Sequence, residues 1–447
     1  MATASLTAPH VAAFEAFQRV IDGGEAEWLG SLRRKAILRF QEVGFPTRKH
    51  EDWKHTDVGP IARSPFRVDP GSDAPRIAGD LIEGFTFGVL KCSQLVFVNG
   101  RFAPRLSYLR WLPDGVQVRS LGEVRRARPR SLEPHLASIA TWDANPFTAL
   151  NTAFFEDGAF IHLPKGAVVE EPIHLLFVSA AQDPPVAAHP RNLILLEEAS
   201  QATLIESYVG LDRGPYLTNA VTEVHVGPGA SLDHYKMQRE ADAGFHVADM
   251  AVHQDRGSVV SATSIALGGS LARNDVRVTF QGEGGDLTLN GLYALGGQQQ
   301  VDNHTFIDHA TPNCTSRELY KGILDGRSRG IFYGKILVRQ DAQKTSSKQT
   351  NKNLLLSNEA FVDSTPGLEI LADDVRCNHG STIGQLDENA VFYLRSRGID
   401  EEAARSLLTY AFASELINQV KVASMRIRLD QLILSRLPSA EILPEAA

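Results

Sequence analysis

The chain has 447 residues, of which 43% are hydrophobic and 22% are charged, a composition typical of a folded protein with two or three domains. Its formal net charge of -8 argues against nucleic-acid binding, which needs a basic field. No apolar run approaches the roughly 18 residues that span a bilayer, and the N-terminus lacks the pattern of a signal peptide. We therefore expect a cytoplasmic protein that binds neither nucleic acid nor membrane.

Two helices are predicted at the start of the chain. Apolar residues recur at helical spacing between residues 11 and 21 and again between residues 28 and 43, and Gly44 is placed to end the second helix. The next stretch, Gly44 to Thr56, reads GFPTRKHEDWKHT, and we interpret it as a connector pinned by Trp53. With a predicted strand at residues 95–98, these elements form an N-terminal helical and mixed α/β domain, residues 1-158.

Residues 159-386 are predicted to form a parallel β-helix. Helical periodicity nearly vanishes there, and short β-branched or alternating runs are separated by glycines. Gly229, Gly257 and Gly285 are 28 residues apart and each precedes a new run, a weak repeat that favours a solenoid over a β-sandwich or barrel. We interpret the polar stretch from Lys344 to Asn353 as turns between coils.

The end of this region carries a candidate metal site. Cys377 lies two residues before His379 in the stretch DDVRCNHGSTIG, so in a strand both side chains point to the same face. Thiolate and imidazole are suitable ligands for iron or zinc, but two ligands cannot complete a four-coordinate site. The alternative is a buried cysteine beside a hydrogen-bonded histidine. The three cysteines of the chain are widely spaced and include no Cys-x-x-Cys motif, so any metal needs ligands from elsewhere.

Residues 387-447 are predicted to form a C-terminal helical domain. A short helix ends at Gly398, and Asp400 is a suitable N-cap for a longer helix that follows. Apolar residues occupy more than one side of the longer helix, which indicates two packing surfaces, both internal or one of them facing a partner. One apolar face carries Ala404, Leu407, Leu408, Ala411 and Phe412. A last helix is expected between residues 427 and 437.

Four stretches of the sequence resemble the SufD branch of the SufB/SufD family, the β-helix scaffold proteins of the SUF iron-sulfur cluster assembly machine. They are GFPTRKHEDWKHT from Gly44, SRELYKGIL from Ser316, LEILADDVRCNHGSTIG from Leu368 and FYLRSRGIDEEAARSLLTYAF from Phe392. The first stretch and the scarcity of cysteines resemble SufD more than its paralogue SufB. His55 departs from the family pattern, in which this position is commonly Tyr.

The resemblance implies a mainly β fold, with a right-handed parallel β-helix core between the two terminal domains. It implies a non-catalytic scaffold subunit of a SufBCD complex, which pairs with SufB as a heterodimer and docks the ATPase SufC, while a cysteine desulfurase system supplies sulfur. No cofactor is expected to stay bound to the chain alone. A transient iron-sulfur cluster would form at the SufB interface with His379 and Cys377 as ligands. The SufC contacts would include Leu407, Leu408, Ala411 and Phe412.

Two other interpretations remain open at this point. A carbohydrate-active β-helix enzyme would use carboxylates that line a groove, with Asp302 and Asp308 as candidates. A purely structural homodimer is the other, although a homodimer in isolation is compatible with the scaffold as well. We interpret His304 and His309, which lie near Cys314 in the sequence, as turn and core residues and not as a second metal site.

Overall fold

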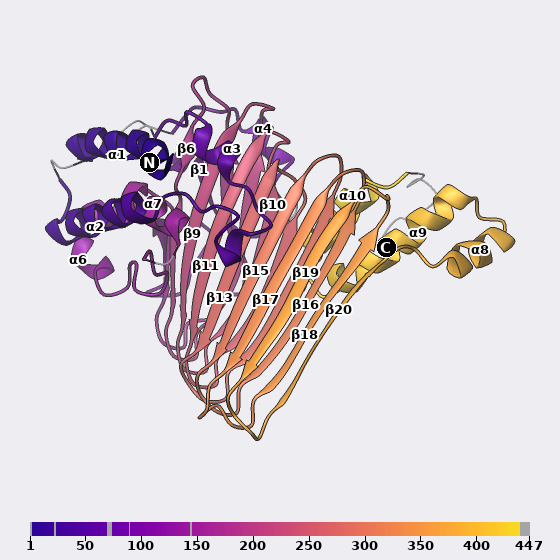
Figure 1. Ribbon diagram of the computed structural model, residues 1–447. Coiled ribbons are helices and arrows are strands. Elements are labelled where there is room, and N and C mark those ends of the chain that lie inside the picture. The colour runs from indigo at the N-terminus through magenta and orange to yellow at the C-terminus, as the bar shows by residue number, and fades with distance from the viewer. Residues whose placement is uncertain (1, 22–23, 69–73, 89, 144, 439–447) are drawn as a thin grey trace.

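The computed structural model describes residues 2–21, 24–68, 74–88, 90–143 and 145–438; the last nine residues of the predicted C-terminal domain, 439–447, lie outside this part. The chain is built around a parallel β-solenoid whose strands alternate between two sheets, with helices at both ends of the sequence (Figure 1). The predicted fold class is therefore confirmed. Among the described residues, no helix is both long and apolar enough to span a membrane.

Each sheet of the solenoid contains strands that are stacked in the order of the coils. Sheet 1 consists, in spatial order, of β2 (Arg101–Phe102), β1 (Ser93–Val98), β5 (Ile173–Ser179), β8 (Gln201–Gly210), β10 (Ser231–Arg239), β12 (Val259–Ala266), β14 (Asp286–Leu295), β16 (Thr315–Leu324), β18 (Ser346–Leu355) and β20 (Arg376–Gly384). Sheet 2 consists of β3 (Gln117–Ser120), β4 (Ala159–Leu163), β7 (Arg191–Leu196), β9 (Tyr216–Val226), β11 (Gly244–Gln254), β13 (Leu271–Phe280), β15 (Gln300–His309), β17 (Arg329–Val338) and β19 (Phe361–Ile370), and β6 (Ala187–Ala188) pairs with β9. From β4 and β5 onward all strand pairs along these two stacks are parallel.

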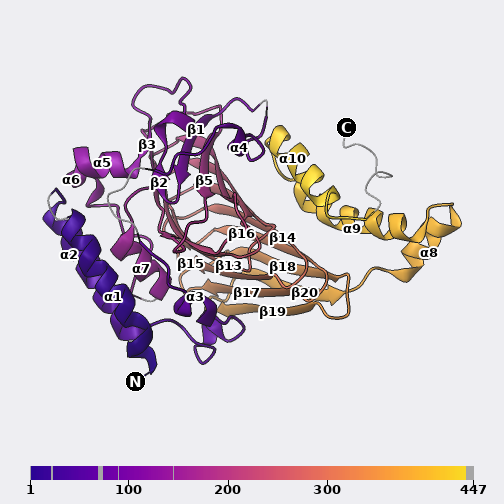
Figure 2. The ribbon, with the colours of Figure 1, turned by 90° about the horizontal axis from the view of Figure 1, so that it is seen from above.

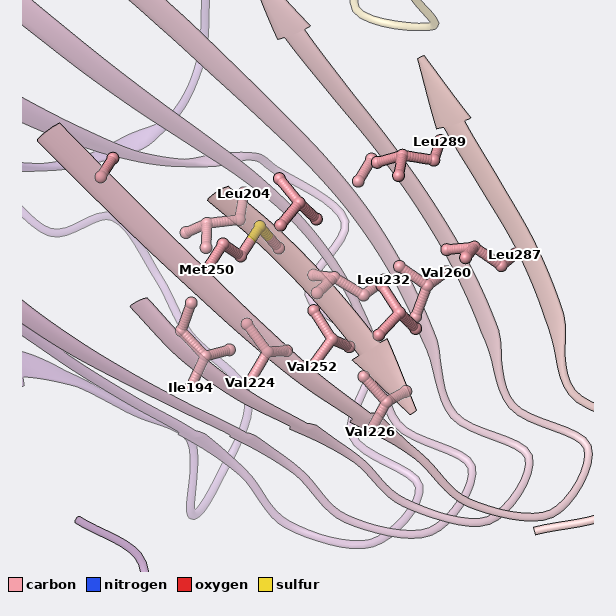
Figure 3. Packing of buried hydrophobic residues seen from close by; sticks show 14 of the residues in the cluster. Ile194, Leu204, Val224, Val226, Leu232, Met250, Val252, Val260, Leu287 and Leu289 are labelled. Atoms are coloured by element: carbon pink, nitrogen blue, oxygen red, sulfur yellow. The ribbon is translucent and has the colours of Figure 1, made fainter. Parts of the chain in front are cut away.

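The core lies between the two sheets and is formed by alternate side chains of each strand. Leu232, Val260 and Leu287 are register partners in neighbouring strands, so they stack in one column in the interior (Figure 3). Burial of each such side chain contributes roughly 1.5–3 kcal/mol. The predicted glycine repeat marks the turns before this column, where Gly229 and Gly257 both have φ 66. In the third coil Gly284, with φ 75, takes this role in place of the predicted Gly285.

The interpretation of Lys344 to Asn353 as turns is wrong for most of its length, because residues 346–355 form strand β18. Its alternate residues Ser347, Gln349, Asn351 and Asn353 are buried between the sheets. The strand therefore places polar side chains inward, where hydrogen bonds satisfy most of their polar groups, and lacks the apolar alternation by which strands are recognised.

Helices from the N-terminal part cover the outer face of sheet 2. They are α1 (Ala2–Ile21), α2 (Glu27–Val43), α3 (Gly59–Arg63), α5 (Leu121–Ala127), α6 (Pro129–Leu132) and α7 (Pro146–Phe154), with the 3-10 turn η1 (Glu51–Trp53). Helix α4 (Asp80–Glu83) and the 3-10 turn η2 (Pro104–Leu106) instead pack on the outer face of sheet 1. The predicted helices α1 and α2 pack with α7 on apolar residues of β9, β11 and β13, as Phe17, Phe40, Leu150 and Leu217 show. The second helix ends at Gly44, which has φ 68, as predicted.

The connector after α2 is fixed to the solenoid by a buried ionic network. The Arg273 guanidinium lies 3.7 Å from the ring centroid of Trp53, which confirms the anchoring role of that residue. Arg273 also pairs with Asp302 at 2.8 Å and Asp275 at 2.9 Å, and donates to the backbone carbonyl of Asp52 at 2.7 Å. The N-terminal segment and the middle of sheet 2 therefore share one set of buried charges.

Three helices follow the last coil: α8 (Glu388–Ser396), α9 (Glu401–Ile417) and α10 (Ala423–Leu434). Asp400 caps α9 as predicted, because its carboxylate accepts from the Ala403 backbone N–H at 3.0 Å. Apolar residues of α9 and α10, including Leu416 and Leu429, pack on the outer face of sheet 1. Helix α8 instead projects away from the solenoid, beyond β19 and β20 (Figures 1 and 2).

Candidate functional site

The last coil leaves one end of the solenoid open. Strands β19 and β20 stand last in their sheets, with β17 and β18 as their neighbours, so each presents an edge that no described strand covers. Such an edge carries backbone N–H and C=O groups that can pair with another chain. Exposed apolar residues, Phe361, Ile370, Leu371 and Ile383, surround this end. The open end thus combines unpaired backbone with apolar surface, as an interface does.

The predicted pair Cys377 and His379 lies on β20, at this open end. In the parallel register they are partners of Ser347 and Gln349, which are both buried in the interior, so both side chains belong to the interior-facing set of β20. This confirms that the two residues share a face of a strand. His379 is exposed because no further coil covers it, whereas Cys377 is half-buried and packs against the core.

The two side chains differ in their readiness to bind a metal. Burial raises the pKa of the Cys377 thiol above its ordinary value, so at neutral pH this residue is protonated and binds metal only if the metal displaces the proton. No group of three or more His, Cys, Asp or Glu residues that could hold a metal occurs in the described part of the chain. The pair supplies at most two ligands, so a four-coordinate iron or zinc site here requires ligands from another molecule.

Polar residues continue from this pair into the interior in two columns. Each column runs through β16, β18 and β20: Ser316, Ser347 and Cys377 form one, and Glu318, Gln349 and His379 the other. The Ser316 and Ser347 hydroxyls lie 2.8 Å apart, and Gln349 Nε2 donates to Glu318 Oε2 at 2.7 Å. The second column matters most for the site, since it ends at the exposed imidazole.

The carboxylates expected of a carbohydrate-active enzyme do not form a catalytic pair. Asp302 is buried; although burial raises its pKa, the charges of His304 and Arg273 hold that pKa well below its ordinary value. Asp308 is engaged by both ends of the Arg339 guanidinium, at 2.9 and 2.6 Å. Both carboxylates serve as partners in structural ion pairs, so nothing in this geometry favours glycoside chemistry.

The histidines near Cys314 are structural, as expected from the sequence. His309 is buried and its Nε2 lies 2.9 Å from the Ser316 hydroxyl. His304 pairs with Asp302 at 2.9 Å and stacks on Tyr333.

The C-terminal helices present a second candidate surface, which only partly coincides with the predicted one. Leu407, Leu408 and Phe412 are half-buried and Ala411 is exposed; the Phe412 ring lies 4.1 Å from Lys321 Nζ, on the surface of the solenoid. The most exposed aromatic side chains of these helices are instead Phe392 and Tyr393 on α8, at 70% and 56% exposure. They lie at the start of a stretch that resembles the SufD branch, but their exposure was not readable from the sequence.

Comparison with known proteins identifies the family of this chain. The family model described as "SUF system FeS cluster assembly, SufBD core domain" matches residues 177–412, and that of the "SufBD protein N-terminal region" matches residues 5–175. The chain belongs to the SufBD family. Membership of this family supports a role for the SufBD chain in iron-sulfur cluster assembly.

Two relatives match this SufBD chain over nearly its whole length. It is 35% identical to an iron-sulfur cluster assembly SufBD family protein of Synechocystis sp., over 94% of this chain and 93% of that protein. It is 33% identical to the iron-sulfur cluster assembly protein SufD of Escherichia coli, over 90% of this chain and 92% of that protein. The predicted family is thereby confirmed.

Proposed function

We propose that this SufBD chain is a non-catalytic scaffold subunit of a cytoplasmic SufBCD complex, in which its open end pairs with a SufB paralogue. The observation that carries the proposal is the position of Cys377 and His379 on the last strand of sheet 1, whose outer edge no described strand covers. A partner that covers this edge would both satisfy the free backbone groups and bring the missing ligands to the pair. Sulfur would come from a cysteine desulfurase system, and ATP hydrolysis from SufC.

The two residues take different parts in this proposal. His379 is exposed and binds iron as a neutral imidazole, whereas Cys377 binds as a thiolate once metal has displaced its proton. The cluster is transient and bridges two chains, since this chain alone provides an incomplete ligand set. In the absence of SufB, the same edge can pair with that of a second copy, which gives a homodimer.

The first prediction concerns His379. His379→Ala should abolish or sharply reduce the iron and acid-labile sulfide of the complex co-expressed anaerobically with SufB and SufC, because a ligand is removed while the edge stays intact. Asn378→Ala is the matched control: Asn378 is an exposed neighbour outside the interior-facing set. Unchanged cluster content in an assembled His379→Ala complex would move the chemistry to SufB and reduce this chain to a structural subunit.

The second prediction concerns the C-terminal helices, where SufC would bind over the predicted residues Leu407, Leu408, Ala411 and Phe412 and over the exposed aromatic pair of α8. Replacing Phe392 and Tyr393 with alanine should weaken SufC binding by at least about tenfold, since exposed aromatics that become buried often dominate interfaces. Calorimetric titration of SufC into the purified chain measures this. Trp111→Ala, which removes an exposed aromatic of the N-terminal part, should leave affinity unchanged. If the native chain, the Phe392 and Tyr393 double variant and Trp111→Ala bind SufC with equal affinity, α8 is excluded from the docking surface.

A further inference from the structure

The side chain of Gln349, one coil behind His379, has only one of its two polar atoms in a hydrogen bond. Its Nε2 donates to Glu318 Oε2 at 2.7 Å, but its Oε1 has no hydrogen-bond partner among the described residues. The residue is fully buried. Buried carbonyl oxygens in folded proteins nearly always accept a hydrogen bond, so this oxygen lacks a donor that the site is expected to provide.

The register of the sheet places one candidate donor residue beside Gln349 on the neighbouring strand. Gln349 is the direct register partner of His379 on β20 and of Glu318 on β16, and all three side chains belong to the same interior-facing column. Since Glu318 already holds the amide nitrogen, the amide oxygen is left for the other neighbour in the column. A histidine ring carries an N–H that can fill this need.

The opposite sheet leaves room for Gln349 in this position. Gly334 on β17 faces it, and a Cβ atom at Gly334 would lie 2.4 Å from Gln349 Nε2. The backbone of Gly334 is outside the left-handed region, so its conformation does not itself require glycine. The absence of a side chain at Gly334 therefore serves the amide of Gln349.

Metal-binding histidines use one ring nitrogen for the metal and donate the N–H of the other to an oxygen acceptor, which fixes tautomer and ring orientation. We propose that Gln349 is the positioning residue of the cluster site: its Oε1 accepts the ring N–H of His379 and directs the other ring nitrogen toward iron. Glu318 Oε2 accepts from Nε2 and so holds the amide in the required orientation. Above about pH 7, where the tautomer is to be measured, the Glu318 side chain is a carboxylate and can only accept, which selects Nε2. This inference rests on the proposed role of His379 as an iron ligand.

The experiment reads the tautomer of His379 in the full-length chain without metal, by long-range proton–nitrogen NMR on protein labelled with 15N-histidine. The His379 signals are assigned by their loss in His379→Ala. In the native chain we expect one neutral tautomer to exceed the other by about tenfold, the effect of one hydrogen bond to a buried acceptor. Gln349→Met should bring the two tautomers close to equal population. Ser347→Ala, a change in the neighbouring column, should leave the ratio unchanged.

Glu318→Gln and Gly334→Ala provide the same test without altering Gln349 itself. A glutamine at 318 can donate or accept, so the amide of Gln349 loses its orientation, and a methyl group at 334 displaces it. Both should shift the tautomer ratio toward equality. In the anaerobic complex with SufB and SufC, Gln349→Met should also lower iron content at limiting iron by about tenfold, the usual effect of losing such an acceptor.

Failure of the role of Gln349 can be distinguished from failure of the proposed function of His379. A native tautomer ratio near one, or a ratio that none of the three substitutions changes, would overturn the role of Gln349 even if His379→Ala abolishes the cluster. Conversely, if His379→Ala leaves the cluster intact, the proposed function fails, and with it the iron-positioning role, whatever the tautomer ratio shows.

Discussion

Replacing Arg273 with methionine is expected to lower the free energy of unfolding by about 3 to 5 kcal/mol, the usual effect of breaking a buried ion pair from one side. Arg273 is buried, and its guanidinium neutralises the Asp302 and Asp275 carboxylates while it lies against Trp53. Methionine fills much of the space but leaves the carboxylates without their main cation. Urea unfolding followed by circular dichroism measures the loss.

The control for this change is an exposed arginine on a strand of the solenoid. Arg317 pairs with Asp286 at 3.0 Å at the surface, so Arg317→Met should change stability by no more than about 1 kcal/mol. Arg273 also holds η1 against the solenoid, because it contacts Trp53 and the backbone carbonyl of Asp52. Arg273→Met should therefore make residues 44–56 accessible to limited proteolysis. A stability loss no larger than that of Arg317→Met, with no new cleavage, would show that the network does not hold the N-terminal segment.

The second large effect is a pH dependence that originates from Glu318. Burial raises the pKa of this carboxyl group to about 7 in the folded protein, from 4.5. Between these values the unfolded chain has released its proton and the folded chain retains it, so stability falls as pH rises through this window. The loss is about 3 kcal/mol and is complete above about pH 7. Below pH 4.5 both states are protonated, so this loss of stability is absent.

Glu318→Gln should remove this dependence, because an amide does not titrate. We expect the variant to match the native chain at about pH 4.5 and to exceed its free energy of unfolding by about 3 kcal/mol at about pH 8. Denaturant unfolding at both pH values tests this. Glu359→Gln, a change to an exposed carboxyl group, should follow the native curve. A difference between Glu318→Gln and native protein that does not vary with pH would contradict the assignment.

Features that depend on neighbouring residues were predictable from the sequence. The cap at Asp400, the helix end at Gly44 and the turn glycines Gly229 and Gly257 each follow from local backbone chemistry, and the structure has all of them. The shared face of Cys377 and His379 is of the same kind, since it requires only that the segment is a strand.

Features that depend on the coil length were not predictable. Gln349 is a partner of Glu318, 31 residues earlier, whereas Leu232 and Val260 are 28 residues apart, so the repeat has no fixed period from which a register can be counted. The contact of Trp53 with Arg273 likewise requires the complete solenoid.

The polar interior was missed for a further reason. Sequence patterns identify strands by apolar residues that face a core, and β18 places amides and hydroxyls there.

The two ends of the solenoid have different terminal strands, and this difference limits how the protein can polymerise. At the start, the short antiparallel strands β2 and β3 close the two sheets, a common way to blunt an edge. A solenoid with two bare edges could add copy after copy into a fibre. Here, in the part of the chain that the structure describes, the long uncovered edges are those of β19 and β20, at one end, whereas β2 and β3 have only 2 and 4 residues. When two molecules associate through β19 and β20, these edges are covered in both molecules, so the assembly is a closed dimer and does not extend into a fibre.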